Sequence, residues 1–160
     1  MNKINVLFVC MGNICRSPTA EAVFCYEVAA AGLSRHVASD SAGTHAYHIG
    51  KAPDARAQRY AARRGFDLSA HRARQVAATD YEHFDYVLAM DADNLALLAR
   101  HCPPAHAAKL VLFMCYGKKE DAVDVPDPYY GDKQGFEQVL DMVEDAAQGL
   151  LRHIRERHAL

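Results

Sequence analysis

The strongest constraint on the fold lies near the N-terminus, where an apolar run is followed by a short loop and a helix-forming segment. The run, residues 4–9, has the composition of a buried β-strand. The loop begins at Cys10 and reaches Arg16, and Ser17 and Pro18 then fit the N-cap and the first residue of a helix. The segment therefore predicts a strand, a tight loop and a helix in immediate succession.

The composition of this loop favours an anion-binding site that contains a reactive sulfur. Gly12 and Asn13 tolerate positive φ, so the loop can turn its backbone N–H groups inward. These groups and the helix dipole create a positive spot, which holds phosphate and stabilises a thiolate at Cys10. Arg16 can bind two phosphate oxygens and keeps its charge. A core cysteine beside a surface arginine would not explain why all these features coincide in one segment.

The length and charge of the chain exclude several classes of protein. Its 160 residues are the size of one domain, so we expect a single unit over residues 1–160. The formal net charge of −2 gives no indication of a nucleic-acid surface, and no apolar run is long enough to predict membrane insertion. The N-terminus lacks a signal-peptide pattern, and five cysteines without scaffold spacing favour a reducing, cytoplasmic location.

Nine histidines raise the question of a metal site. No pair of histidines or cysteines at ligand spacing is matched by a second pair, so we expect neither a metal nor another cofactor.

Strand-like and helix-like segments alternate along the whole chain. Strands are expected at 4–9, 37–42, 86–89 and 109–112, and helices at 18–31, 53–64, 91–100 and 136–154. This alternation predicts an α/β fold, a four-stranded parallel sheet with helices on both faces in a single domain. Ligands of such sheets bind at the carboxyl ends of the strands, which is where Cys10 lies.

The chain resembles the low molecular weight protein tyrosine phosphatases in a series of motifs that follow one another in the family's order. The first motif is Cys-x5-Arg-Ser at residues 10–17, and the last is Asp-Pro-Tyr-Tyr-Gly at 127–131. Three further matching segments lie between them, at 40–43, 69–75 and 84–91. The resemblance implies the family's α/β fold. It also implies a phosphotyrosine-protein phosphatase, which hydrolyses aryl phosphate monoesters through a phosphocysteine intermediate.

The resemblance gives three residues a catalytic role. Cys10 would be the nucleophile, and Arg16 would hold the charge of the phosphoryl group. Asp127 would protonate the leaving oxygen and later act as the base for water, with Asp124 as a weaker alternative. The phosphate would lie in the loop formed by Met11, Gly12, Asn13, Ile14, Cys15 and Arg16.

A substrate pocket and a supporting network are also implied. Aromatic walls suit a phenyl ring, and the expected pocket residues are Met11, Tyr47, Tyr129 and Tyr130. A polar network would hold the shape of the loop, with Ser17 donating its hydroxyl to the Cys10 thiolate. Its expected members are Asn13, Ser17, Ser41 and His71. Asp91 either joins the edge of the site or caps the helix that follows it.

Two other enzymes on this fold are alternatives. Arsenate reductases use two further cysteines in a redox relay, whereas Cys102 and Cys115 are 13 positions apart and do not form a close pair. Protein-arginine phosphatases tend to have threonine where Ile14 stands and lack the tyrosine pair, so this chain favours an aryl phosphate. A binding module without activity is disfavoured because all three implied catalytic residues are present.

The loop also contains a predicted redox pair. A loop folded around phosphate can bring the sulfurs of Cys10 and Cys15 together, and a sulfenic acid at Cys10 would then condense with Cys15. The expected partners are a phosphotyrosine-containing protein as substrate and inorganic phosphate as product. The sequence leaves the physiological substrate and the oligomeric state open.

Overall fold

The sheet of this protein has four parallel strands in the order β2-β1-β3-β4. The structure, a computed structural model, describes residues 2–118, 124–129 and 133–160. The strands are β1 (Ile4–Cys10), β2 (Val37–Gly43), β3 (Tyr86–Ala89) and β4 (Leu110–Leu112). The predicted α/β fold with a four-stranded parallel sheet is confirmed.

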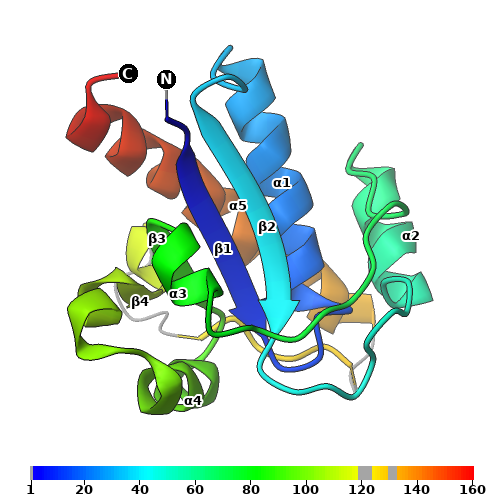
Figure 1. Cartoon of the computed structure of the whole chain (residues 1–160). Coiled ribbons are helices and arrows are strands. Elements are labelled where there is room, and N and C mark those ends of the chain that lie inside the picture. Colours follow the sequence, from blue (N-terminus) through cyan, green and yellow to red (C-terminus); the bar gives the residue numbers. More distant parts are fainter. Residues whose placement is uncertain (1, 119–123, 130–132) are drawn as a thin grey trace.

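Helices cover both faces of the sheet (Figure 1). The α-helices are α1 (Arg16–Ala30), α2 (Ala55–Arg63), α3 (Asp80–His83), α4 (Ala92–His101) and α5 (Lys133–His158). Two short 3₁₀ helices flank β4, η1 (Pro104–Lys109) and η2 (Phe113–Tyr116). Both chain termini lie at the end of the molecule opposite to the carboxyl ends of β1 and β2 (Figure 1).

Strand β1 lies between two hydrophobic clusters, which explains its uninterrupted apolar sequence. On one face Phe8 contacts Phe24 of α1 and Phe113 of η2, with ring centroids 5.6 and 5.2 Å apart. On the other face Leu7 and Val9 belong to a cluster that includes residues of α3 and α4. Burial on both faces fixes the register of β1, and therefore the position of Cys10 at its end.

Helix α1 begins earlier than predicted. Cys15 is its N-cap and Arg16 its first residue, so Ser17 and Pro18 are not the cap and the first residue. The physical reason is that the hydroxyl of Ser17 lies 3.0 Å from the sulfur of Cys10 instead of capping the helix. The other helices were predicted within a few residues, whereas α3, η1 and η2 were not predicted.

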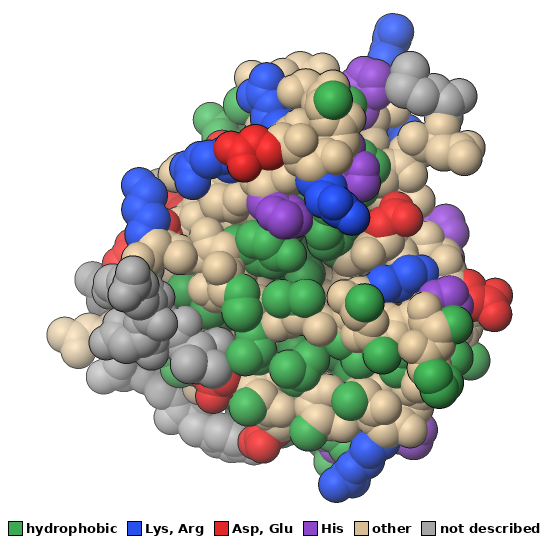
Figure 2. Space-filling model, turned by 90° about the vertical axis from the view of Figure 1, so that its left-hand side faces the viewer, with side chains coloured by type: hydrophobic (Ala, Val, Ile, Leu, Met, Phe, Trp, Pro, Cys, Tyr) green, Lys and Arg blue, Asp and Glu red, His purple; other side chains and the backbone are tan. Residues whose placement is uncertain are grey.

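Apolar side chains gather on the side of the molecule formed by α4, η1 and β4 (Figure 2). Helix η1 buries none of its members and exposes mainly alanine and proline. Within the described ranges, no helix is long and apolar enough to cross a membrane.

Candidate active site

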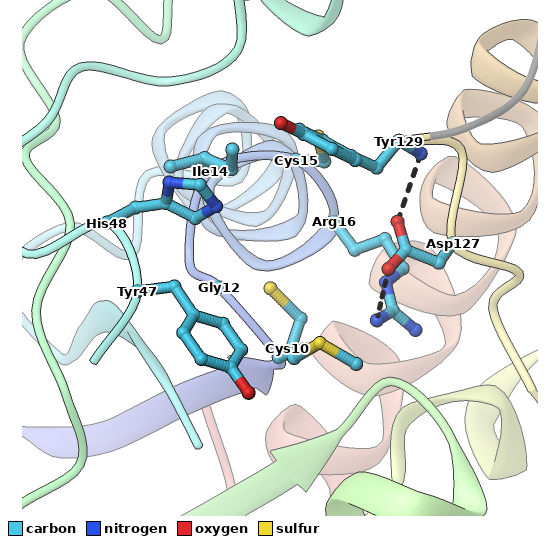
Figure 3. A pocket seen from close by; sticks show the side chains of 10 residues that line it. Cys10, Gly12, Ile14, Cys15, Arg16, Tyr47, His48, Asp127 and Tyr129 are labelled. Atoms are coloured by element: carbon cyan, nitrogen blue, oxygen red, sulfur yellow. Dashed lines mark hydrogen bonds and ion pairs between the residues drawn. The ribbon is translucent and has the colours of Figure 1, made fainter. Parts of the chain in front are cut away.

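A small pocket lies at the carboxyl end of β1, where the chain turns into α1. Its volume is about 110 Å³. Residues from three separate parts of the chain surround it (Figure 3), and its lining consists of Cys10, Met11, Gly12, Ile14, Cys15, Arg16, Tyr47, His48, Asp127 and Tyr129. The structure thus brings together most of the residues expected from the sequence, and we call this pocket the catalytic hollow. Tyr130, also expected here, lies outside the described residues.

Cys10 is the last residue of β1 and is only 3 % exposed. Its sulfur lies 3.0 Å from Oγ of Ser17, and it accepts a hydrogen bond from the backbone N–H of Asn13 at 3.3 Å. In Figure 3 the sulfur points into the catalytic hollow. The sulfur thus has two polar neighbours and faces the hollow, which is the placement that a nucleophile needs.

The N-terminus of α1 faces the same place. Its N-cap, Cys15, makes no side-chain cap bond. Pro18, the third helical residue, has no N–H to be capped. The positive end of the α1 dipole is therefore available to an anion bound above Cys10.

Arg16 is almost fully buried, at 2 % exposure, and its guanidinium is held by several acceptors. Its Nη1 donates to Oδ2 of Asp91 at 2.5 Å and to the carbonyl of Val125 at 3.0 Å. Its Nη2 lies 3.4 Å from Oδ2 of Asp127. Burial by itself would lower the pKa of Arg16, but the negative charges of Cys10, Asp91 and Asp127 outweigh it, and the pKa is raised. The guanidinium is thus a permanent positive charge in a fixed position.

Asp91 fulfils both roles that the sequence left open. Its Oδ1 accepts the backbone N–H of Asn94 at 2.8 Å, which caps α4, while its Oδ2 binds Arg16. The residue therefore ties the start of α4 to the edge of the site.

Asn13 is the centre of the network behind the loop. It adopts a left-handed conformation, with φ of 58°, and is completely buried. Its Nδ2 donates to Ser17 Oγ at 2.8 Å and to Ser41 Oγ at 3.0 Å. Its Oδ1 accepts the backbone N–H of Arg74 at 3.0 Å and lies 3.1 Å from Nε2 of His71. All four residues predicted to support the loop therefore meet at one amide.

The direction of these bonds has a consequence for Cys10. Because Oδ1 of Asn13 accepts from Arg74, the other end of the amide must be the donor to Ser17. The oxygen of Ser17 accepts that bond, which leaves its own hydrogen for the sulfur of Cys10 at 3.0 Å or the carbonyl of Ala42 at 3.4 Å. The network thus holds the hydroxyl of Ser17 beside the sulfur.

The far end of the network contains the carboxyl group of Glu21 and the imidazole of His71, both of which are partly buried. Oγ of Ser41 donates to Oε1 of Glu21 at 2.7 Å, and Nδ1 of His71 lies 3.6 Å from the same oxygen. Burial raises the pKa of Glu21, against the opposing effect of the Ser41 bond. Burial also lowers the pKa of His71.

Asp127 lies on the other side of the hollow, on a surface segment (Figure 3). Its Oδ1 accepts the backbone N–H of Tyr129 at 3.0 Å, and its side chain is 35 % exposed. The segment is anchored at Val125, whose N–H donates to the carbonyl of Met90 at 2.7 Å. A carboxyl group in this position can exchange protons with water and still reach the hollow.

Two residues near the site were not found from the sequence. Arg56 donates to the carbonyl of Tyr129 at 2.7 Å, and its guanidinium lies 5.8 Å from the centroid of that ring. His48 lines the hollow and packs so closely on Gly12 that a Cβ there would lie 2.8 Å from Cδ2 of the imidazole. Neither belongs to a recognisable motif, and both reach the site only through tertiary packing.

Tyr47 stands at the rim of the hollow and is 66 % exposed. Its ring stacks on that of His45, with centroids 4.9 Å apart and planes at 13°.

Cys15 is buried, and its pKa is strongly raised. Burial is the larger cause, and the negative charge of Asp54 is the next largest. All five cysteines are free thiols in this structure. A disulfide between Cys10 and Cys15 therefore remains a prediction.

The described part of the chain contains no cluster of three or more side chains suited to hold a metal.

A strand-end thiol, a buried arginine and a helix N-terminus around one hollow, with a carboxyl group opposite, define a cysteine-dependent phosphatase of the α/β class. The chain belongs to the low molecular weight phosphotyrosine protein phosphatase family, whose sequence profile matches residues 5–160. The prediction of a protein tyrosine phosphatase, a hydrolase, is thereby confirmed at the level of the family.

Individual relatives are similar over most of their length. A low molecular weight protein-tyrosine-phosphatase of Streptomyces coelicolor is 46 % identical over 95 % of this chain and 94 % of its own. A crystal structure of a protein tyrosine phosphatase from Entamoeba histolytica superposes with a TM-score of 0.93 and is 38 % identical, covering 99 % of this chain and all of the other. A Drosophila arginine phosphatase structure has a TM-score of 0.87 and 32 % identity, covering 94 % and 97 %.

Proposed function

We propose that this protein hydrolyses phosphotyrosine in proteins through a phosphocysteine formed on Cys10. The observation that carries the proposal is the position of the Cys10 sulfur. It lies 3.0 Å from Ser17 Oγ and 3.3 Å from the Asn13 N–H, in the same hollow as Arg16 and Asp127.

In the first step the Cys10 thiolate attacks phosphorus in line with the phenol oxygen. The S–P bond forms as the P–O bond to the phenol breaks, and Asp127 donates its proton to the departing oxygen. Loop N–H groups and Arg16 stabilise the charge on the three equatorial oxygens. Two features support this role in binding the phosphoryl oxygens. The N-terminus of α1 contributes a partial positive charge, and the raised pKa of Arg16 keeps its guanidinium protonated.

In the second step water attacks the phosphocysteine and releases inorganic phosphate. Asp127, now ionised, accepts a proton from that water. The S–P bond breaks and the thiolate returns, stabilised by the hydroxyl of Ser17 and the N–H of Asn13. Met11, Gly12, Ile14 and Cys15 complete the lining around the phosphate.

Tyrosine is the side chain that the walls of the hollow favour. Tyr47 and Tyr129 offer aromatic surfaces to a phenyl ring. Ile14, 9 % exposed, adds an apolar wall that has no partner for a guanidinium. A second candidate is phosphoarginine, because the Drosophila arginine phosphatase shares the fold.

An arsenate reductase relay finds no support in the positions of the other cysteines. Neither Cys102 nor Cys115 lines the hollow, and the thiol of Cys102 donates to the carbonyl of Pro103 at 3.4 Å. Five free thiols support a reducing compartment, and we place the protein in the cytoplasm.

The test is hydrolysis measured on three substrates. p-Nitrophenyl phosphate is followed against pH, and a phosphotyrosyl peptide is compared with a phosphoarginyl peptide of the same sequence at equal concentration. We expect turnover of the aryl phosphate without added metal, and a higher kcat/KM for phosphotyrosine. No turnover of any aryl phosphate would refute the proposal, and a higher kcat/KM for phosphoarginine would establish the second candidate.

A further inference from the structure

A second, larger pocket opens beside the catalytic hollow. Its volume is about 450 Å³, within the range of roughly 300–1,000 Å³ that is usual for ligand pockets. It lies between the loop after β2, the segment leading into α3, and helix α4. Its lining is apolar at Val76, Tyr81, Leu97 and Leu98, with His45 and His101 among its polar members. The mechanism described above uses none of these residues.

One stacked pair of rings connects the two pockets. His45 lines the second pocket and Tyr47 lines the catalytic hollow, and their ring centroids are 4.9 Å apart. The backbone fixes this pair to the nucleophile loop, because His45 donates its N–H to the carbonyl of Met11 at 3.0 Å. The preceding residue, Thr44, likewise donates to the carbonyl of Cys10 at 2.9 Å. The second pocket therefore has a fixed position directly beyond the rim of the hollow.

The lining selects for an apolar occupant. Among the described residues that form it there is no lysine, arginine, aspartate or glutamate. A charged side chain would lose its hydration there without gaining an ionic partner, whereas an apolar one gains free energy by leaving water.

We propose that the second pocket binds an apolar side chain of the phosphotyrosyl polypeptide, two or three residues away from the phosphotyrosine. This rests on the proposed function, since a protein substrate continues on both sides of its phosphotyrosine while the hollow holds only about 110 Å³. An extended chain advances about 3.3–3.6 Å per residue. Two residues thus span about 7 Å and three about 10 Å, and the two pockets are neighbours on either side of the stacked rings of His45 and Tyr47.

The first experiment measures kcat/KM for phosphotyrosyl peptides with alanine on both sides. A single leucine is placed at one of the positions −3, −2, +2 or +3, and a second series carries aspartate there instead. We expect leucine to raise kcat/KM over alanine about tenfold at one of these positions, and aspartate to give no gain. p-Nitrophenyl phosphate, which is too small to reach the second pocket, reports the catalytic step alone.

The second experiment fills the pocket. Ala78→Glu places a charged side chain in its lining, and Ala77→Glu does so from the adjacent residue if the first variant folds poorly. Ala99→Glu is the matched control, because Ala99 is an exposed residue of α4 outside the lining. The ratio of kcat/KM for the leucine and alanine peptides should fall to about one in the pocket variants and stay at its original value in the control. Hydrolysis of p-nitrophenyl phosphate should be unchanged in all of them.

Two results would overturn the proposal: no preference for leucine at any position in the unmodified protein, or a preference that survives both pocket variants. Failure to hydrolyse p-nitrophenyl phosphate in the unmodified protein is a different outcome, because it refutes the proposed function itself.

Discussion

The phosphate loop, residues 10–17, and the acid segment, residues 124–129, face the same hollow but are held in different ways. The loop is largely buried, and Asn13 alone bonds it to three residues behind it, Ser41, His71 and Arg74. The acid segment is exposed at three of its six residues, and the contacts that hold it include those of Val125 with Met90 and of Tyr129 with Arg56. The proposed nucleophile is therefore held by a buried polar network, whereas the proposed acid depends on a buried anchor at Val125 and on contacts nearer the surface. Damage to the loop should affect every substrate, and damage to the acid segment only those that need a proton.

Among substitutions in the loop, Cys10→Ser should cause the largest loss of activity. A serine hydroxyl is not ionised near neutral pH and no base adjoins it, so turnover should fall by about four orders of magnitude or more. The loss should be similar for good and poor leaving groups. The measurement is kcat on p-nitrophenyl phosphate, and activity at a sizeable fraction of the original would exclude Cys10 as the nucleophile.

Asp127→Asn tests the acid segment on the other side of the site. It should slow the hydrolysis of aryl phosphates with poor leaving groups by about 10²–10⁴-fold and that of aryl phosphates with good leaving groups far less, because a good leaving group needs little protonation. The measurement is kcat against leaving-group pKa for a series of substituted phenyl phosphates. Asp124→Asn is the control, since Asp124 accepts the N–H of Ala92 at 3.0 Å at the start of α4. Equal losses across the series would remove Asp127 from the acid role.

Arg56→Ala tests whether surface contacts really position the acid. It removes the 2.7 Å bond to the carbonyl of Tyr129, so we expect the same dependence on leaving group as in Asp127→Asn, with a loss of only about tenfold. Arg59→Ala, an exposed arginine on the same helix, should change nothing. A uniform loss over all leaving groups in Arg56→Ala would show that the arginine acts on binding instead.

Ile14→Thr concerns selectivity rather than rate. Threonine introduces a hydroxyl beside the leaving group, so the preference for phosphotyrosine over phosphoarginine should fall several-fold. Ile14→Val is the matched control, because valine keeps the branched shape without the polar atom. The readout is the ratio of the two kcat/KM values, and an unchanged ratio would move the origin of selectivity to the tyrosines of the pocket.

Cys15→Ser should have the smallest effect on the starting activity and a large one after oxidation. Peroxide should convert the Cys10 thiolate to a sulfenic acid, which the thiol of Cys15 converts to a disulfide with loss of water. Inactivation should be slower with phosphate bound and reversible by a thiol reductant, but largely irreversible in Cys15→Ser. Cys25→Ser, at an exposed position, is the control. Mass spectrometry should detect a Cys10–Cys15 link, and a link to another cysteine would contradict the prediction.

The features that the sequence predicted well are those specified locally. The apolar run of β1, the turn at Gly12 and Asn13, and the charge of Arg16 lie within a few residues of one another. Each has an intrinsic preference that the fold does not override. For this reason the position of Cys10 at a strand end and the succession of strand, loop and helix followed from one short segment, whereas the parallel sheet followed from the alternation of strands and helices along the chain.

The features that were missed depend on contacts between distant segments. The start of α1 was misplaced because Ser17, a good cap by composition, is engaged by Cys10 and Asn13 instead. Arg56 lies 73 positions from Tyr129, whose carbonyl it binds, and no local pattern indicates such a pair. The short 3₁₀ helices around β4 likewise lack the periodicity by which longer helices are predicted.

The long sequence separation between Arg16 and its partners has a consequence during synthesis of the protein. Asp91 and Val125 follow Arg16 by 75 and 109 positions. At about 5–20 residues per second, a ribosome needs roughly 5–20 s after Arg16 to produce Val125. Until then the nascent chain lacks the carbonyl of Val125 and the carboxylate of Asp127 that contact the guanidinium of Arg16. The growing polypeptide thus contains the thiol before the arginine is fixed, and phosphatase activity should arise only after Asp127 has been synthesised.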